Sequence, residues 1–119
     1  MQKRFIIFTC EHAINAIPSQ YKHLFNKKEK ILKTHSGFDH GTKEFGRAFG
    51  EFYGAPVVYG KFSRLMVDLN RSHGHRTTFS EMTRGLSKQE RNEILTQYHH
   101  PHWKEIKFLI SLSIKGSRL

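Results

Sequence analysis

The chain has 119 residues, of which 37% are hydrophobic and 25% charged, and this composition is typical of a soluble globular domain. We expect a cytoplasmic protein, because no apolar run approaches the roughly 18 residues of a membrane span, no signal peptide is evident, and the single cysteine, Cys10, excludes an internal disulfide. The formal net charge of +10 is compatible with binding either nucleic acid or a dianionic substrate, but only the segment from Lys22 to Lys33 is densely basic, so we expect no dedicated nucleic-acid function.

The first half of the chain predicts a strand, helices and a second strand. Arg4–Thr9 is a short apolar, β-rich run, and Ser19–Leu32 predicts two short helical pieces separated at Asn26. Gly41–Tyr53 predicts a helix that ends at Gly54, followed by a strand at Ala55–Tyr59. The two strands are expected to be parallel, with a right-handed crossover. The helix has one apolar face at helical spacing, formed by Phe45, Ala48, Phe49 and Phe52.

The run Ser63–Arg71 is predicted to be an extended strand. Alternation would place Leu65, Val67 and Leu69 on one face and Arg64, Met66, Asp68 and Asn70 on the other.

The last third of the chain predicts helix after a polar loop that extends from Ser72 to Gly85. Ser87 is expected to cap a helix, with Glu90 at the reciprocal position of a capping box. Pro101 either breaks that helix or begins a second one, and the segment 108–114 is ambiguous between helix and strand.

Three segments carry residues suited to chemistry. Glu11 and His12 follow the carboxyl end of the first strand, and ligands collect at the carboxyl ends of strands in open α/β sheets. His35, Asp39 and His40 combine imidazole and carboxylate groups, the mixture that holds a divalent zinc ion and its acidified water. The run Ser63–Arg71 threads charges through an apolar stretch, and such charges are costly unless paired. The simpler interpretation of this run is an amphipathic strand whose charged side chains face water.

The order of these motifs resembles the N-formylglutamate amidohydrolase family. The matching residues are Glu11-His12-Ala13-x-Asn15-x-x-Pro18, then His35-x-Gly37-x-Asp39-x-Gly41, then Ser63-Arg64-Leu65-x-Val67-Asp68-x-Asn70-Arg71, with a weaker match at Tyr98-His99-His100-Pro101. The resemblance implies an α/β fold, a partial three-layer αβα domain with a mostly parallel sheet, phosphorylase/hydrolase-like and related to zinc carboxypeptidases. It also implies a zinc-dependent hydrolase that cleaves the amide bond of an N-formyl or N-acyl acidic amino acid such as N-formylglutamate.

The resemblance assigns roles to particular residues. His12, Asp39 and His35 are the expected metal ligands, Arg64 and Glu11 the expected catalytic groups, and Arg64, Asp68, Asn70 and Arg71 the expected substrate-binding residues. Asp68 is also expected to pair with one of the arginines. Alternatives stay open: His12 as a core histidine bonded to backbone, Glu11 as a metal ligand, an orienting group or a surface carboxylate, and Asp39 as a helix cap.

Members of this family are considerably longer, so we expect residues 1–119 to form a single incomplete domain that resembles the N-terminal half. Such a domain would leave a sheet edge and an apolar face uncovered. Either a second chain completes it or the chain is a remnant, and we expect the isolated chain to bind zinc weakly and turn over slowly or not at all. The alternatives are a degenerate, non-catalytic family member with a ligand-binding or interaction role, and a small basic nucleic-acid-binding protein.

Overall fold

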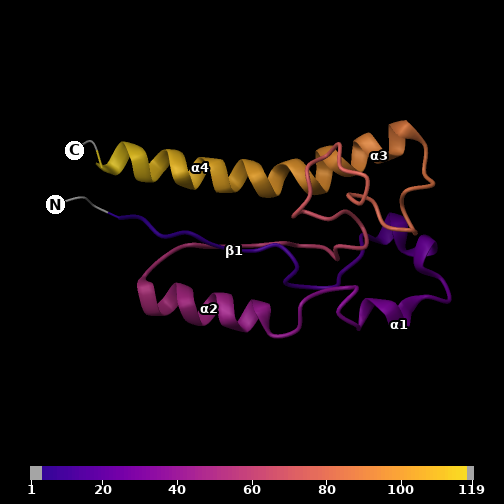
Figure 1. Cartoon of the computed structure of the whole chain (residues 1–119), viewed down its shortest axis with the longest axis horizontal. Coiled ribbons are helices and arrows are strands. Elements are labelled where there is room, and N and C mark those ends of the chain that lie inside the picture. The colour runs from indigo at the N-terminus through magenta and orange to yellow at the C-terminus, as the bar shows by residue number, and fades with distance from the viewer. Residues whose placement is uncertain (1–3, 118–119) are drawn as a thin grey trace.

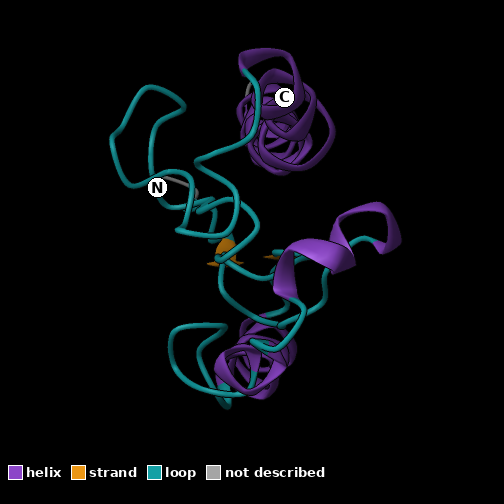
Figure 2. Cartoon of the chain, turned by 90° about the vertical axis from the view of Figure 1, so that its right-hand side faces the viewer, coloured by secondary structure: helices purple, strands orange, loops and turns teal. Residues whose placement is uncertain are grey.

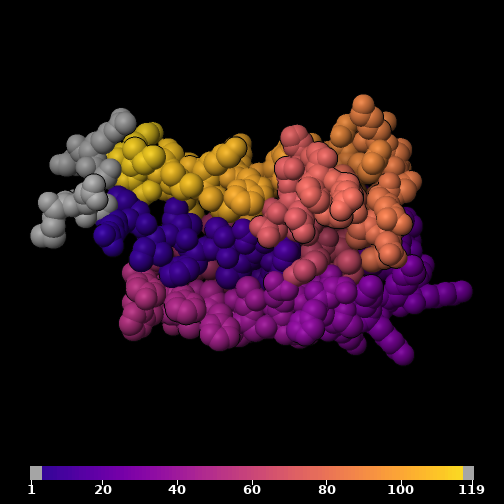
Figure 3. Space-filling model, in the orientation of Figure 1, coloured from indigo at the N-terminus to yellow at the C-terminus, as the bar shows by residue number. Residues whose placement is uncertain are grey.

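The centre of the fold is a parallel pair of strands. The computed structural model describes residues 4–117. β1 (Phe8–Cys10) pairs in parallel with β2 (Val57–Tyr59), and helix α2 (Thr42–Tyr53) connects them. Helix α4 (His100–Ser117) lies on the opposite side of the sheet from α2, as two perpendicular views show (Figures 1 and 2). The space-filling view shows the N-terminal segment between these two layers (Figure 3). The predicted strand, helix, strand unit is confirmed, as a mixed α/β domain with a two-stranded sheet.

Helix α2 packs on the sheet through glycines. A Cβ atom at Gly46 would lie 2.5 Å from Cys10 Sγ, and one at Gly50 would lie 2.5 Å from Val57 Cγ2. Two members of the predicted apolar face point to solvent, since Phe45 is 67% and Phe52 81% exposed, whereas Phe49 packs on Phe8 of β1 at a ring-centroid distance of 5.6 Å. Close approach of the helix backbone to the sheet therefore accompanies limited side-chain packing at this contact.

The largest cluster of buried side chains lies away from α2. It joins η1 (Ser19–Phe25, a 3-10 helix) to the segment 63–71 and to the helical segment around Ile94. The buried members of the cluster are Ile17, Tyr21, Phe25, Met66, Val67, Leu69, Ile94 and Leu95.

A second short helix, α1 (Glu29–Leu32), follows η1, which confirms the two predicted helical pieces. The radius of gyration of the chain is 16.2 Å, whereas a compact domain of this length has about 13.5 Å. The described chain is therefore elongated.

The segment 63–71 forms consecutive turns, so the predicted strand is wrong. Ser63 Oγ accepts the Leu65 N–H at 3.1 Å and donates to the Gly37 carbonyl at 2.7 Å. Asp68 Oδ1 accepts the Asn70 N–H at 2.9 Å. These side chains give the backbone local partners that compete with a strand ladder. The alternation fails as a result, because Met66 is 0% exposed although it was grouped with charged residues.

Strand β1 is also shorter than predicted, because β2 offers only three residues for pairing and residues 4–7 lie outside the ladder.

The C-terminal third forms an uninterrupted helical run. The predicted cap is confirmed: Ser87 Oγ accepts the Glu90 N–H at 3.1 Å at the start of α3 (Lys88–Ile94). A π-helical turn, η2 (Leu95–His99), follows, and α4 begins directly after it. Pro101 thus lies in the first turn of α4, where its missing N–H costs little. The ambiguous segment 108–114 is helical, and no helix within residues 4–117 is long and apolar enough to cross a bilayer.

Gly60 offers a direct test of how β2 meets the end of β1. A Cβ atom there would lie 1.9 Å from the backbone oxygen of Glu11, and the Gly60 N–H donates to the Cys10 carbonyl at 2.8 Å. We expect Gly60→Ala to lower the free energy of unfolding by about 1–3 kcal/mol in urea titrations, because the backbone at Glu11 or at residue 60 must shift to make room for the added methyl group. Gly85→Ala is the control, since no atom lies within 4 Å of its added Cβ. Equal stability of the two variants would contradict this packing.

Candidate functional site

His12 lies between two carboxylates that come from different parts of the chain. It follows β1 by two residues, and its backbone oxygen accepts the Asp39 N–H at 2.8 Å, which fixes the loop 35–41 beside it. Its Nε2 is 2.8 Å from Asp68 Oδ1, and its Nδ1 is 3.6 Å from Asp39 Oδ2. The side chain is only 11% exposed. The alternative of a core histidine bonded to backbone does not describe this geometry.

Arg64 completes a group of four side chains, which we call the His12 cluster: His12, Asp39, Arg64 and Asp68. The Arg64 guanidinium pairs closely with Asp39 Oδ1, while Asp39 Oδ2 faces His12. Asp68 was expected to pair with an arginine, but its recorded hydrogen-bond partners are His12 and the Asn70 N–H. Asp39 does not cap the next helix through its side chain, because Gly41 holds that position with φ of 84° and no side-chain hydrogen bond.

The state of Asp68 decides which nitrogen of His12 carries a proton. Burial of the Asp68 carboxyl raises its pKa, but the hydrogen bonds from His12 and the Asn70 N–H, together with the electrostatic effects of His12 and Arg64, leave the pKa lowered. Asp68 is therefore a carboxylate, which can only accept. His12 must donate from Nε2, and in the neutral imidazole the Nδ1 lone pair faces Asp39 Oδ2. Two lone pairs facing one another favour a cation or a proton between them.

The same pair of atoms has nearly the separation of two zinc ligands. Nitrogen and oxygen ligands about 2.0–2.1 Å from a tetrahedral zinc ion lie about 3.3 Å apart, and His12 Nδ1 and Asp39 Oδ2 are 3.6 Å apart. Within residues 4–117, however, no group of three histidine, cysteine, aspartate or glutamate side chains is arranged to hold a metal ion. The cluster therefore offers two suitable ligands of the three that catalytic zinc sites take from protein.

Two other predicted site residues have their contacts elsewhere. Glu11 faces α4, with Oε1 3.9 Å from His102 Nε2, and this imidazole lowers the pKa of Glu11 against the opposing effect of burial. His35 is exposed, and its ring packs edge-to-face on His40 at a centroid distance of 5.3 Å. Their assignments as a catalytic group and a metal ligand stay predictions.

Asn70 and Arg71 follow Asp68 of the His12 cluster along the same turn and line a cleft of about 720 Å³ beside α4. Two side chains from the last helices hold the backbone around Asn70: Trp103 Nε1–H donates to the Leu69 carbonyl at 2.8 Å, and His99 Nε2 lies 2.7 Å from the Arg71 carbonyl. The sequence interpretation missed Trp103. The feature of the sequence that could have indicated it is the i, i+4 spacing of His99 and Trp103, which places both side chains on one side of a helix.

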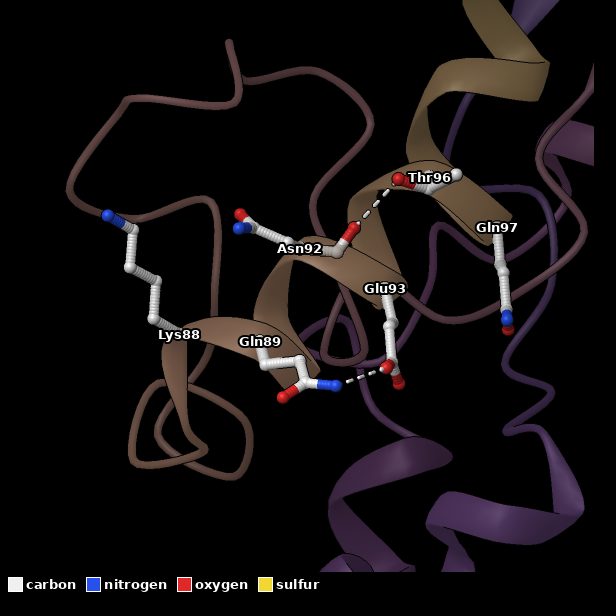
Figure 4. Close-up of a pocket in the computed structure, with 6 residues that line it drawn as sticks. All are labelled: Lys88, Gln89, Asn92, Glu93, Thr96 and Gln97. Atoms are coloured by element: carbon white, nitrogen blue, oxygen red, sulfur yellow. Dashed lines mark hydrogen bonds between the residues drawn. The ribbon is translucent and has the colours of Figure 1, made fainter.

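A second hollow, along α3, lacks such chemistry. Its hydrogen bonds stay within the helical run, from Gln89 Nε2 to Glu93 Oε1 at 3.5 Å and from Thr96 Oγ1 to the Asn92 carbonyl at 2.9 Å (Figure 4). It contains none of the predicted site residues and is a polar helix surface. Its lining residues are Lys88, Gln89, Asn92, Glu93, Thr96 and Gln97.

The buried imidazole of His99 should make stability depend on pH. Burial lowers the pKa of His99, partly opposed by its bond to the Arg71 carbonyl. The unfolded chain then binds more protons below its histidine pKa of about 6.5, so stability falls as pH drops through that value towards the lower folded pKa. We expect His99→Gln to reduce this loss between about pH 7.5 and pH 5.5 in urea titrations. Exposed His23→Gln is the control and should keep the wild-type loss. An unchanged loss in His99→Gln would contradict the prediction.

Comparison with solved structures supports the fold. A crystal structure of a gene product from Agrobacterium tumefaciens matches with a TM-score of 0.84 and 24% sequence identity, over 95% of this chain and 48% of that one. This likeness concerns the fold alone, and the chain spans about half the length of that solved protein. No curated protein matches the chain.

Comparison with protein families gives a match along nearly the whole chain. The model described as N-formylglutamate amidohydrolase matches residues 5–113, a range that includes the His12 cluster and the residues that line the cleft. The resemblance seen in the sequence motifs is thereby confirmed, and the chain belongs to the N-formylglutamate amidohydrolase family.

Proposed function

We propose that this chain acts in a zinc-dependent amidohydrolase that cleaves the amide bond of an N-formyl or N-acyl acidic amino acid such as N-formylglutamate. Membership of an amidohydrolase family supports the reaction type. The observation that carries the proposal is the position of His12, whose Nε2 contacts Asp68 at 2.8 Å and whose Nδ1 faces Asp39 at 3.6 Å. This geometry supports a metal-binding role for His12, because metal-binding histidines commonly have a carboxylate on their other ring nitrogen.

Each member of the His12 cluster takes one role in the proposal. His12 Nδ1 and Asp39 Oδ2 would hold the metal, and Asp68 is a positioning residue that keeps the Nδ1 lone pair available. The chemistry supplied by zinc at this position would be a bound water with a pKa lowered towards neutrality, which could serve as the nucleophile. Arg64 holds Asp39 and offers further N–H donors to the oxyanion that develops on the acyl oxygen. We assign Glu11 no step, because its recorded ionic contact is with His102.

The proposal includes a third metal ligand from outside the described residues. Two suitable donors face each other at the His12 cluster, and residues 4–117 hold no group of three. We propose that another polypeptide segment, such as a second chain, supplies the remaining ligand. The chain alone would then hold zinc weakly and release product slowly or not at all.

Zinc affinity tests the roles of His12 and Asp68. We expect Asp68→Asn to weaken zinc binding by about 10–100-fold, because an amide does not fix the Nε2–H tautomer as a carboxylate does. His12→Gln should abolish the binding that remains. The measurement is competition with a chromophoric chelator.

His40→Gln is the matched control, since His40 is an exposed histidine of the neighbouring loop. Equal affinity in the wild type and in Asp68→Asn would contradict the positioning role. Formate release from N-formylglutamate, assayed with added zinc, tests the reaction. Robust turnover that His12→Ala abolishes would overturn the expected inactivity of the isolated chain, and robust turnover that survives His12→Ala would overturn the assigned site.

A further inference from the structure

The cleft beside α4 has cations on both of its walls. Arg71 lies on the wall formed by the turn after Asp68, and Lys104 and Lys107 lie on the wall formed by α4. None of its lining residues is acidic. The ion pairs found within residues 4–117 involve none of these three side chains. Their charges are therefore not neutralised within the described chain and attract an anion.

The backbone that presents Arg71 is fixed before any ligand arrives. Trp103 donates to the carbonyl of Leu69 at 2.8 Å, and His99 bonds the carbonyl of Arg71 at 2.7 Å. Asp68 closes the same turn by accepting the Asn70 N–H at 2.9 Å. The side chains of Asn70 and Arg71 stay exposed on this fixed turn. Because the backbone is already ordered, only the Arg71 side chain loses conformational entropy when it binds a carboxylate.

The lysine wall is set by helix geometry. Lys104 and Lys107 are three residues apart on α4, so they share one helix face. A ligand with one carboxylate can be neutralised by the Arg71 wall alone. A ligand with two carboxylates uses both walls, and the cleft of about 720 Å³ is large enough for a small dicarboxylate.

We propose that Lys104 and Lys107 are specificity-determining residues that bind the side-chain carboxylate of an acidic N-acyl amino acid, while Asn70 and Arg71 bind its α-carboxylate. The proposal rests on the proposed function for its substrate class. It adds the residues that distinguish an acidic side chain from a neutral one. His99 and Trp103 are positioning residues, because they act through the backbone of the turn.

The test compares two ligands that differ in one charge, N-formylglutamate and its isosteric amide N-formylglutamine. Isothermal titration calorimetry at low ionic strength gives the ratio of their dissociation constants. We expect wild type to prefer N-formylglutamate by about fivefold or more, the effect of about 1 kcal/mol from a charge pair. Lys104→Gln combined with Lys107→Gln should bring the ratio close to one and leave N-formylglutamine binding nearly unchanged. Arg71→Gln should weaken both ligands.

The control removes the same charge elsewhere. Lys22→Gln combined with Lys43→Gln changes two exposed lysines on η1 and α2 and should keep the wild-type ratio. An equal loss of preference in this control, an unchanged ratio in the cleft variant, or no binding of either ligand would overturn the inference. Binding and hydrolysis are measured in separate assays. If the double lysine variant changes the ratio of dissociation constants but the wild type releases no formate, the proposed reaction alone is contradicted. If the wild type releases formate but the ratio is unchanged in that variant, the cleft assignment alone is contradicted.

Discussion

The contact between His12 and Asp68 is the interaction on which the site depends, because it joins segments 56 residues apart at 2.8 Å. The Asp39 N–H bonds the His12 backbone oxygen, so the loop that carries Asp39 is attached to the same point. Since Asp68 is ionised, the contact also sets the tautomer of His12 and turns its Nδ1 lone pair towards Asp39. One hydrogen bond thus determines both the position of the cluster and its capacity to bind a cation.

Helix α4 provides the second constraint. It covers the face of the sheet opposite α2 (Figure 1), and at its beginning Trp103 holds the turn that follows Asp68. The same turn therefore receives His12 on one side and the last helix on the other. Asn70 and Arg71 stay free to meet a ligand because backbone groups, and not their own side chains, carry these contacts. Rigid backbone with free polar side chains is the property that a selective binding site requires.

Local sequence patterns correctly predicted those features that depend on neighbouring residues, such as the ends of helices. Gly54 ends α2 with φ of 58°, and Ser87 with Glu90 begins α3, as their residue types indicate. Long-range contacts decided the rest. Ser63 bonds the carbonyl of Gly37, which converts an apparent strand into turns, and nothing in alternation reveals that partner. The motifs brought His12, Asp39, Arg64 and Asp68 to notice, but their pairing follows from the fold: Asp39 pairs with the arginine, and Asp68 holds the histidine.

The protonation of His12 tests the central claim most directly. Long-range ¹H–¹⁵N correlation spectra of the imidazole distinguish a protonated from an unprotonated ring nitrogen, and His12→Gln identifies the signals. The account predicts that Nε2 carries a proton both with and without zinc, and that added zinc shifts the Nδ1 resonance. A proton on Nδ1 with Nε2 free, or a zinc-induced shift confined to Nε2, would contradict it.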